Sequence, residues 1–92
     1  MYVTVRHYSN AGALIDAIES KPDEVETLVS GVSGFLAYYG TRDGDTYTSV
    51  TVCNEKAGCD ESTRRAGQWV RENVDPRPGK PEITGGEGVI DF

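Results

Sequence analysis

Residues 35–53, FLAYYGTRDGDTYTSVTVC, form the stretch that decides the fold. Apolar and polar side chains alternate on both sides of Asp43-Gly44, and β-branched and aromatic residues are abundant, as is typical of strands. Asp-Gly between two such runs predicts a type I′ turn, because both central residues of that turn need positive φ. The stretch therefore predicts an antiparallel hairpin with strands at 35–42 and 45–53.

The segments on either side of this hairpin predict the remaining elements. Residues 2–8, YVTVRHY, alternate as a strand does, and Pro22 interrupts the apolar helical stripe that precedes the hairpin. The expected elements are, in chain order, a strand at 2–8, helices at 11–19 and 21–31, the hairpin, a helix at 59–74 and a strand at 82–92. This β-α-β-β-α-β order predicts an α+β fold of the ferredoxin-like type, with four antiparallel strands and the helices on one face, as a single domain over residues 1–92.

Composition and charge limit the classes of function. The chain has 92 residues, 15 acidic and 9 basic side chains and a formal net charge of −6. That negative charge repels phosphate groups, so we expect no nucleic-acid partner and no anionic membrane partner. No apolar run reaches the roughly 18 residues of a membrane span, and no basic-then-apolar leader opens the sequence. We therefore expect a cytoplasmic location.

Strand alternation divides the expected sheet into two faces. Val3, Val5, Val50 and Val52 share one face with His7, and this apolar face is expected beneath the helices. The opposite, tyrosine-rich face combines aromatic, hydroxyl, aliphatic and cationic side chains: Tyr2, Thr4, Arg6, Tyr8, Leu36, Tyr38, Tyr47, Ser49 and Thr51. Such a patch is unusual on a monomer, and tyrosine suits a partly wet interface. We therefore expect a homodimer in which two tyrosine-rich faces pack around a small pocket.

Several stretches together resemble a known superfamily. They are the opening YVTVRHY, the SGFLAYYG strand, the Asp-Gly hairpin, the TSVTVCNEKAG passage and the ESTRRAGQWVREN helix. They resemble the dimeric α/β-barrel superfamily, and within it the antibiotic-biosynthesis-monooxygenase (ABM) family. The resemblance implies two ferredoxin-like subunits whose sheets pack into a barrel, each with a pocket for a small ligand. The activities that it implies include cofactor-independent oxygenation of aromatic polyketides or quinols, haem degradation, and isomerisation or decarboxylation of small molecules.

Two neighbouring residues of the first strand, Arg6 and His7, are the candidate catalytic groups. His7 is the only histidine, and its pKa near neutrality suits a general base that removes a phenolic or enolic proton. Its expected position beneath the helices favours instead a structural histidine held by a hydrogen bond. Arg6 could stabilise a carboxylate or phenolate ligand as its anion, or it could form a salt bridge between subunits.

Five further residues are candidates for binding a small aromatic ligand: Tyr8, Tyr38, Ser49, Trp69 and Asn73. The hydroxyl groups of Tyr8, Tyr38 and Ser49 share the tyrosine-rich face with Arg6, although tyrosines there also suit dimer packing. The resemblance implies that Trp69 lines the pocket, whereas its place at the edge of the apolar helix arc also fits an anchor between helix and sheet. Asn73 could bind a ligand, or it could help to end its helix before Pro76.

We expect neither a metal nor another cofactor. Haem-degrading members of the superfamily ligate iron through a histidine of the second helix, and residues 59–74 contain none. Cys53 and Cys59 fit neither a zinc pair nor a redox pair, so we expect free thiols. The leading hypothesis is a cofactor-independent monooxygenase acting on a small aromatic or quinol-like substrate. The alternative is a non-catalytic ligand-binding or structural dimer, and the sequence does not decide whether the chain is an enzyme.

Overall fold

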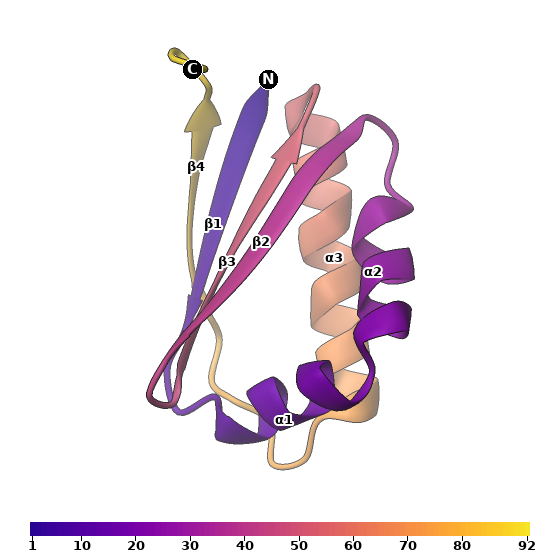
Figure 1. Cartoon of the computed structure of the whole chain (residues 1–92), viewed down its shortest axis with the longest axis vertical. Coiled ribbons are helices and arrows are strands. Elements are labelled where there is room, and N and C mark those ends of the chain that lie inside the picture. Colours follow the sequence, from indigo (N-terminus) through magenta and orange to yellow (C-terminus); the bar gives the residue numbers. More distant parts are fainter.

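The structure, a computed structural model, describes every residue from 1 to 92. Its elements are, in chain order, β1 (Tyr2–Tyr8), α1 (Gly12–Ser20), α2 (Pro22–Ser30), β2 (Phe35–Asp43), β3 (Thr46–Cys53), α3 (Lys56–Asn73) and β4 (Glu82–Glu87). The strands form one antiparallel four-stranded sheet in the order β2-β3-β1-β4, and the helices lie on one side of it (Figure 1). The ferredoxin-like fold predicted from the order of elements is confirmed.

The turn of the β2–β3 hairpin lies one residue later than predicted. Asp43 pairs with Thr46, so the two loop residues are Gly44 and Asp45. Gly44 has a φ of 62° and is the only residue of this turn with positive φ. A turn with glycine first and positive φ there alone is of type II′, so the predicted type I′ turn is wrong. Both strands shift by the same amount, and the division of their residues between two faces is unchanged except at the bulge between Phe35 and Ala37.

The predicted break between the first two helices is confirmed at Lys21, which ends α1 and precedes α2. Pro22 occupies the first turn of α2, where its missing N–H has no partner to lose. Asp23 and Glu24 in the same turn interact favourably with the positive end of the helix dipole. The last helix, α3, begins at Lys56, three residues before the predicted start at residue 59. None of the helices combines the length and apolarity needed to span a bilayer.

The helices cover the face of the sheet opposite to the one that we expected. The buried residues of the covered face are Thr4, Arg6, Tyr8, Tyr47, Ser49, Thr51 and Cys53. This polar face can be buried because every buried side-chain nitrogen and oxygen has a hydrogen-bond partner. The tyrosine-rich face is thus occupied by the chain's own helices, and the prediction that it meets a second subunit is wrong.

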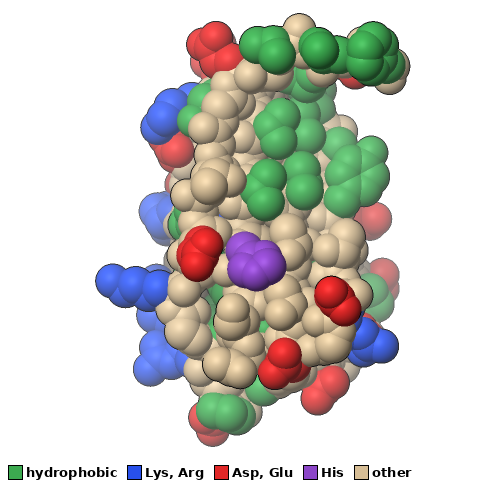
Figure 2. Space-filling model, turned by 90° about the vertical axis from the view of Figure 1, so that its left-hand side faces the viewer, with side chains coloured by type: hydrophobic (Ala, Val, Ile, Leu, Met, Phe, Trp, Pro, Cys, Tyr) green, Lys and Arg blue, Asp and Glu red, His purple; other side chains and the backbone are tan.

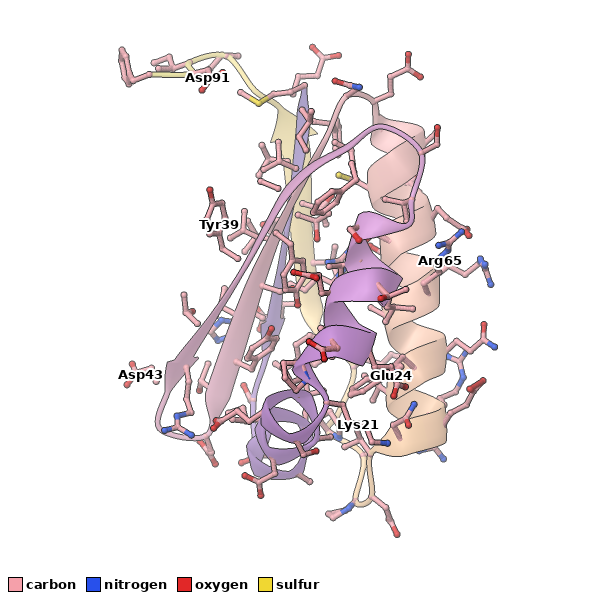
Figure 3. All side chains as sticks on the ribbon, turned by 45° about the vertical axis from the view of Figure 1, so that its right-hand side comes forward. Lys21, Glu24, Tyr39, Asp43, Arg65 and Asp91 are labelled. Carbon is pink, nitrogen blue, oxygen red and sulfur yellow. The ribbon has the colours of Figure 1, made fainter.

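The outer face of the sheet is open and partly apolar. Its centre consists of four half-buried valines, Val3, Val5, Val50 and Val52. Leu36 and Tyr39 at its β2 edge are 50% and 62% exposed. Figure 2 shows hydrophobic side chains gathered over the upper half of this face, and in Figure 3 Tyr39 points away from the helices. The valines predicted to face the helices therefore face outward.

Gly58 determines how closely α3 approaches the rest of the chain. A Cβ atom at this position would lie 2.6 Å from the carbonyl oxygen of Ser33 and 3.1 Å from Cβ of Cys53. Because no larger residue fits there without movement, the first turn of α3 packs tightly over the smaller core cluster of Val32, Cys53 and Cys59.

Candidate functional site

A pocket lies between the helices and the covered face of the sheet. Its volume is about 30 Å³, close to the share of one molecule in liquid water. The polar and aromatic residues that line it are Arg6, Tyr8, Tyr38, Tyr47, Ser49, Ser62 and Trp69, and the others are aliphatic. Five of the predicted site residues therefore meet in one place: Arg6, Tyr8, Tyr38, Ser49 and Trp69.

Arg6 is the charged group of this pocket. Its side chain is 1% exposed and points from the middle of β1 toward α3. Nε and Nη2 donate to Oγ1 of Thr63 at 3.0 and 2.8 Å, Nη1 donates to Oγ1 of Thr51 at 2.9 Å, and Nη2 also donates to the carbonyl oxygen of Cys59 at 3.4 Å. All these acceptors are neutral, so the positive charge is held by hydrogen bonds without a carboxylate to balance it.

Three tyrosines line the pocket together with Arg6. The hydroxyl oxygens of Tyr38 and Tyr47 lie 2.8 Å apart, and the rings of Tyr8 and Tyr47 are tilted at 45° with centroids 6.3 Å apart. Burial raises the pKa of Tyr8, and the positive charge of Arg6 opposes that rise only in part. Burial and the neighbouring Tyr38 also raise the pKa of Tyr47 far above its usual value. Tyr8 and Tyr47 therefore keep their protons near neutral pH and do not serve as general bases there.

Trp69 lines the pocket and ties α3 to α2 as well. Its indole Nε1–H donates to Oε1 of Glu24 at 2.8 Å, so this polar contact joins two helices, whereas the expected anchor joined a helix to the sheet. Asn73 lies outside the pocket: its Nδ2 donates to the carbonyl oxygen of Trp69 at 2.9 Å, and its Oδ1 accepts from Nζ of Lys21 at 3.0 Å. Figure 3 labels Lys21 and Glu24 beside α3. The position of Asn73 corresponds to the helix-ending alternative.

A surface groove of about 600 Å³ adjoins the pocket, and its lining combines apolar side chains with Glu19, Glu26 and Ser30. The residues that line both spaces are Ile18, Val25, Val29 and Tyr38. The groove runs between β2 and the α1–α2 pair, with Phe35 and Pro22 at its margins. Tyr38 therefore stands at the boundary between this groove and the pocket.

His7 does not belong to this site. Its side chain is exposed on the outer face of the sheet, where Nδ1 lies 3.0 Å from Oγ1 of Thr48. The purple side chain in Figure 2 marks it below the apolar patch. The alternation that places Arg6 in the pocket turns His7 the opposite way, so the sheet separates His7 from a ligand held at Arg6. The expected position of His7 beneath the helices is wrong, because the helices cover the opposite face of the sheet.

Thr51, Thr63 and Tyr47 complete the site, although the sequence did not single them out for it. Thr51 and Thr63 supply the oxygens that hold Arg6, and Tyr47 holds Tyr38. The available signal was the composition of the buried arc of α3, where Ser62 and Thr63 carry small polar groups among apolar neighbours. Hydroxyl groups on the side of a helix that is expected to be buried need hydrogen-bond partners. Here the hydroxyl group of Thr63 accepts hydrogen bonds from the buried Arg6.

Metal-ligating groups are scattered in this chain. No three His, Cys, Asp or Glu side chains come together in a way that could hold a metal ion. Cys53 and Cys59 are buried free thiols, and burial followed by the interaction with Cys59 raises the pKa of Cys53 to about 11. The thiol of Cys53 is thereby kept protonated and unreactive at neutral pH.

Comparison with known proteins gives matches in structure alone. No family model matches the chain, and no curated protein matches it. Among solved structures, a mutant of MhuD with two manganese protoporphyrin IX molecules bound per active site is 14% identical with a TM-score of 0.71, covering 100% of this chain and 98% of that one.

Two oxygenase-type structures match similarly. A presumed antibiotic biosynthesis monooxygenase from Bordetella bronchiseptica is 14% identical with a TM-score of 0.71, covering 97% of each chain. SnoaB, a cofactor-independent oxygenase from Streptomyces nogalater, is 14% identical with a TM-score of 0.67, covering 99% of this chain and 95% of that one. Likeness over whole chains at such low identity establishes a common fold.

Proposed function

From the fold that this chain shares with antibiotic-biosynthesis monooxygenases, we propose that it binds a small phenol, enol or quinol as its anion against Arg6 and oxygenates it without a bound cofactor. The observation that carries this proposal is the buried guanidinium without a carboxylate partner, in a pocket lined mainly by apolar and tyrosine side chains. The fold shared with the cofactor-independent oxygenase SnoaB supports the reaction class.

The charge of Arg6 determines which ligands the pocket favours. An uncompensated buried ion has an effective penalty of several kcal/mol, which a bound anion would reduce. An opposite charge within hydrogen-bond distance lowers the pKa of an acidic group by about 1–3. A phenol or enol placed at Arg6 is therefore held as its electron-rich anion, whereas a cationic ligand is repelled.

The anion is the form that reacts with oxygen. For an anthrone-type substrate, the bound enolate gives one electron to O₂, and the resulting substrate radical and superoxide combine to form a carbon–oxygen bond. Protonation gives a hydroperoxide, which loses water as the C–H bond of the same carbon breaks and the O–O bond is cleaved. The carbon ends as a carbonyl, so O₂ supplies one oxygen atom to the product and one to water, and no further reductant is needed.

The pocket supplies stabilisation of the anion and no general base. Tyr8 and Tyr47 have raised pKa values and keep their protons, and His7 lies across the sheet. The substrate's proton therefore leaves to solvent before or during binding, and the rate of reaction follows the ionisation of the substrate. This condition favours substrates more acidic than an ordinary phenol, such as enolised diketones.

Binding of an aromatic ring requires the pocket to widen. Its volume of about 30 Å³ is far below the roughly 300–1,000 Å³ of ligand sites in general, whereas the adjoining groove provides about 600 Å³. We place the ring in the groove, with Tyr38 rotated aside so that the ring oxygen reaches Arg6. The Tyr38–Tyr47 hydrogen bond is then broken in the complex.

The experiment combines ligand binding with oxygen uptake. Para-nitrophenol, which is coloured only as its anion, should show an apparent pKa about 1–3 lower when bound. Oxygen uptake with an anthrone should exceed that in buffer. Arg6→Gln should abolish both the shift in the pKa of para-nitrophenol and the oxygen uptake. Arg6→Lys should retain part of the pKa shift, because it keeps the positive charge. Circular dichroism of each variant checks that it folds.

His7→Ala is the matched control from the same strand, and it should leave both measurements unchanged. If Arg6→Gln does not fold, Thr63→Val tests the same point by removing the oxygen that holds Nε and Nη2. Oxygen uptake equal to buffer for the wild-type protein, or equal uptake by wild type and a folded Arg6 variant, contradicts the proposed reaction.

A non-catalytic ligand-binding protein is the second candidate. The small closed pocket and the lack of a base within it favour this function. The same experiment separates the two: a lowered apparent pKa of para-nitrophenol without oxygen uptake indicates binding alone.

The assembly that we propose is a homodimer through the outer face of the sheet. The apolar patch of Val3, Val5, Val50 and Val52 is of the kind that a second sheet covers in sheet-on-sheet packing. The C-terminal segment 88–92 beyond β4 adds Val89, Ile90 and Phe92, all exposed. A cytoplasmic location, consistent with the two free thiols, completes the proposal.

A further inference from the structure

Some Lys and Arg side chains of this acidic protein have a hydrogen-bond or ion-pair partner, and others have none. Lys and Arg together number nine. Arg42, Lys56, Arg64 and Arg65 form ion pairs with carboxylates. Lys21 donates to Asn73, and Arg6 is held by the hydroxyls of Thr51 and Thr63. The three that remain, Arg71, Arg77 and Lys80, make no side-chain hydrogen bond or ion pair, although acidic residues outnumber basic ones by 15 to 9.

All three unpaired cations line one groove. It has a volume of about 400 Å³ and lies between the second half of α3, the connection at residues 74–81 and the start of β4. The charged residues of its lining are Arg71, Arg77 and Lys80, with no acidic residue among them. Figure 2 shows lysine and arginine side chains along one edge of the molecule. The groove is therefore a positive site on a negatively charged protein.

Two prolines restrict the backbone of the connection that carries Arg77 and Lys80. Pro78 and Pro81 lie beside Arg77 and Lys80 in the lining, and proline fixes φ and reduces the freedom that binding would otherwise remove. Gly67 of α3 contributes no side chain, which leaves the floor of the groove open beneath Arg71. Tyr8 and Val70 line both this groove and the Arg6 pocket, so the two spaces are neighbours.

We propose that this groove binds a small, multiply charged anion with phosphate or carboxylate groups. Three cations without carboxylates attract a ligand of several negative charges, and arginine matches the geometry of phosphate and carboxylate oxygens. The volume falls in the range of about 300–1,000 Å³ that small molecules occupy. A long polyanion such as nucleic acid is disfavoured by the net charge of −6, which acts over the rest of the surface. This site stands apart from the oxygenation proposed above.

Calorimetric titration of the whole protein with inorganic pyrophosphate and with citrate tests the inference. We expect saturable binding that weakens as the ionic strength rises, because an exposed groove is screened by salt. Arg77→Ala/Lys80→Ala should weaken binding of pyrophosphate at least tenfold. Arg42→Ala/Lys56→Ala removes the same number of cations from ion pairs elsewhere and should leave binding unchanged, so the net charge is matched.

Arg6→Gln separates this site from the oxygenase pocket. We expect it to bind pyrophosphate like the wild-type protein, even where it has lost all response to phenols. No saturable binding of either probe, or equal weakening by the two double variants, overturns the inference. Loss of pyrophosphate binding in folded Arg6→Gln also overturns it, because the anion would then occupy the Arg6 pocket. Melting temperatures close to that of the wild type show that each double variant is intact.

Discussion

Gly40 shows how much the pocket depends on a single small residue. A Cβ atom at this position would collide with the hydroxyl group of Tyr47, which lies over the glycine and bonds to Tyr38. Gly40 pairs with Ser49, so both lie on the helix side of the sheet. The missing side chain is therefore what allows Tyr47 to reach Tyr38 above the Arg6 pocket.

Gly40→Ala should destabilise the protein by about 1–3 kcal/mol, because an added carbon in a filled site forces neighbours to move. The change should also displace Tyr47 and alter para-nitrophenol binding. Urea unfolding measures the first effect, and titration of the ligand measures the second.

Gly86→Ala is the control for this prediction. Gly86 is also a strand glycine, and no atom lies within 4 Å of the Cβ that it would gain. The Gly86→Ala variant should be as stable as the wild type or slightly more stable, since alanine has less backbone freedom than glycine in the unfolded chain. A Gly40→Ala protein as stable as Gly86→Ala would contradict the account of the Tyr47 contact.

Alternation alone could predict which residues share the site. Arg6, Tyr8, Tyr38 and Ser49 share a face by parity, and the structure brings them together. The alternation of residues along a strand does not say which face of the sheet the helices cover. The expectation that the valines lie beneath the helices was wrong. The polar face is internal here because Thr51 and Thr63 satisfy Arg6, a pairing between distant segments that the local sequence pattern does not reveal.

Helix α2 is attached to α3 by few polar contacts, and these flank the pocket. The indole of Trp69 donates to Glu24, and Lys21 donates to Asn73. Because α2 also supplies Val25 and Val29 to both the pocket and the groove, its position determines how far the site opens.

Glu24→Ala should lower the free energy of unfolding by about 0.5–1.5 kcal/mol, the usual contribution of one hydrogen bond. It should also allow faster ligand binding, because α2 is released. Trp69 is the only tryptophan, so its fluorescence reports both unfolding and ligand association.

Glu24→Gln keeps an oxygen acceptor for the indole and serves as the matched variant. It should lie between wild type and Glu24→Ala in stability. Identical association rates for all three proteins would show that this contact does not limit access to the pocket.

The order of elements was predictable because each has a strong local signal. Pro22 separates the first two helices, and a glycine at position 44 fixes the hairpin. The bulge between Phe35 and Ala37, which takes Leu36 out of the alternation, has no comparable signal. It lies where Phe35 pairs with Cys53, at the end of the hairpin farthest from its turn.

The whole molecule has one surface that its own helices leave uncovered. Valines of β1 and β3 are paired across the outer face, Val3 with Val52 and Val5 with Val50. In the proposed homodimer this patch becomes internal, so a charge introduced there would be removed from water without a partner.

Val50→Asp should therefore convert a dimer into a monomer. Light scattering at micromolar concentration should give the mass of two 10.0 kDa chains for the wild type and of one chain for the variant. Ser30→Asp, on an exposed position of α2, adds the same charge elsewhere and should remain dimeric. A wild-type protein with the mass of a single chain would remove the basis for the sheet-to-sheet assembly.

The two ends of the chain lie at the same end of the sheet (Figure 1), where the Gly88 N–H donates to the carbonyl oxygen of Met1 at 2.8 Å. A linker of a few residues could join them without disturbing any strand. The backbone could then be cut open at the Gly44-Asp45 turn to give a circular permutant, or two copies could be encoded in tandem as one polypeptide. The permutant would change the order in which the strands are synthesised while keeping their pairing in the sheet, and the tandem protein would keep both.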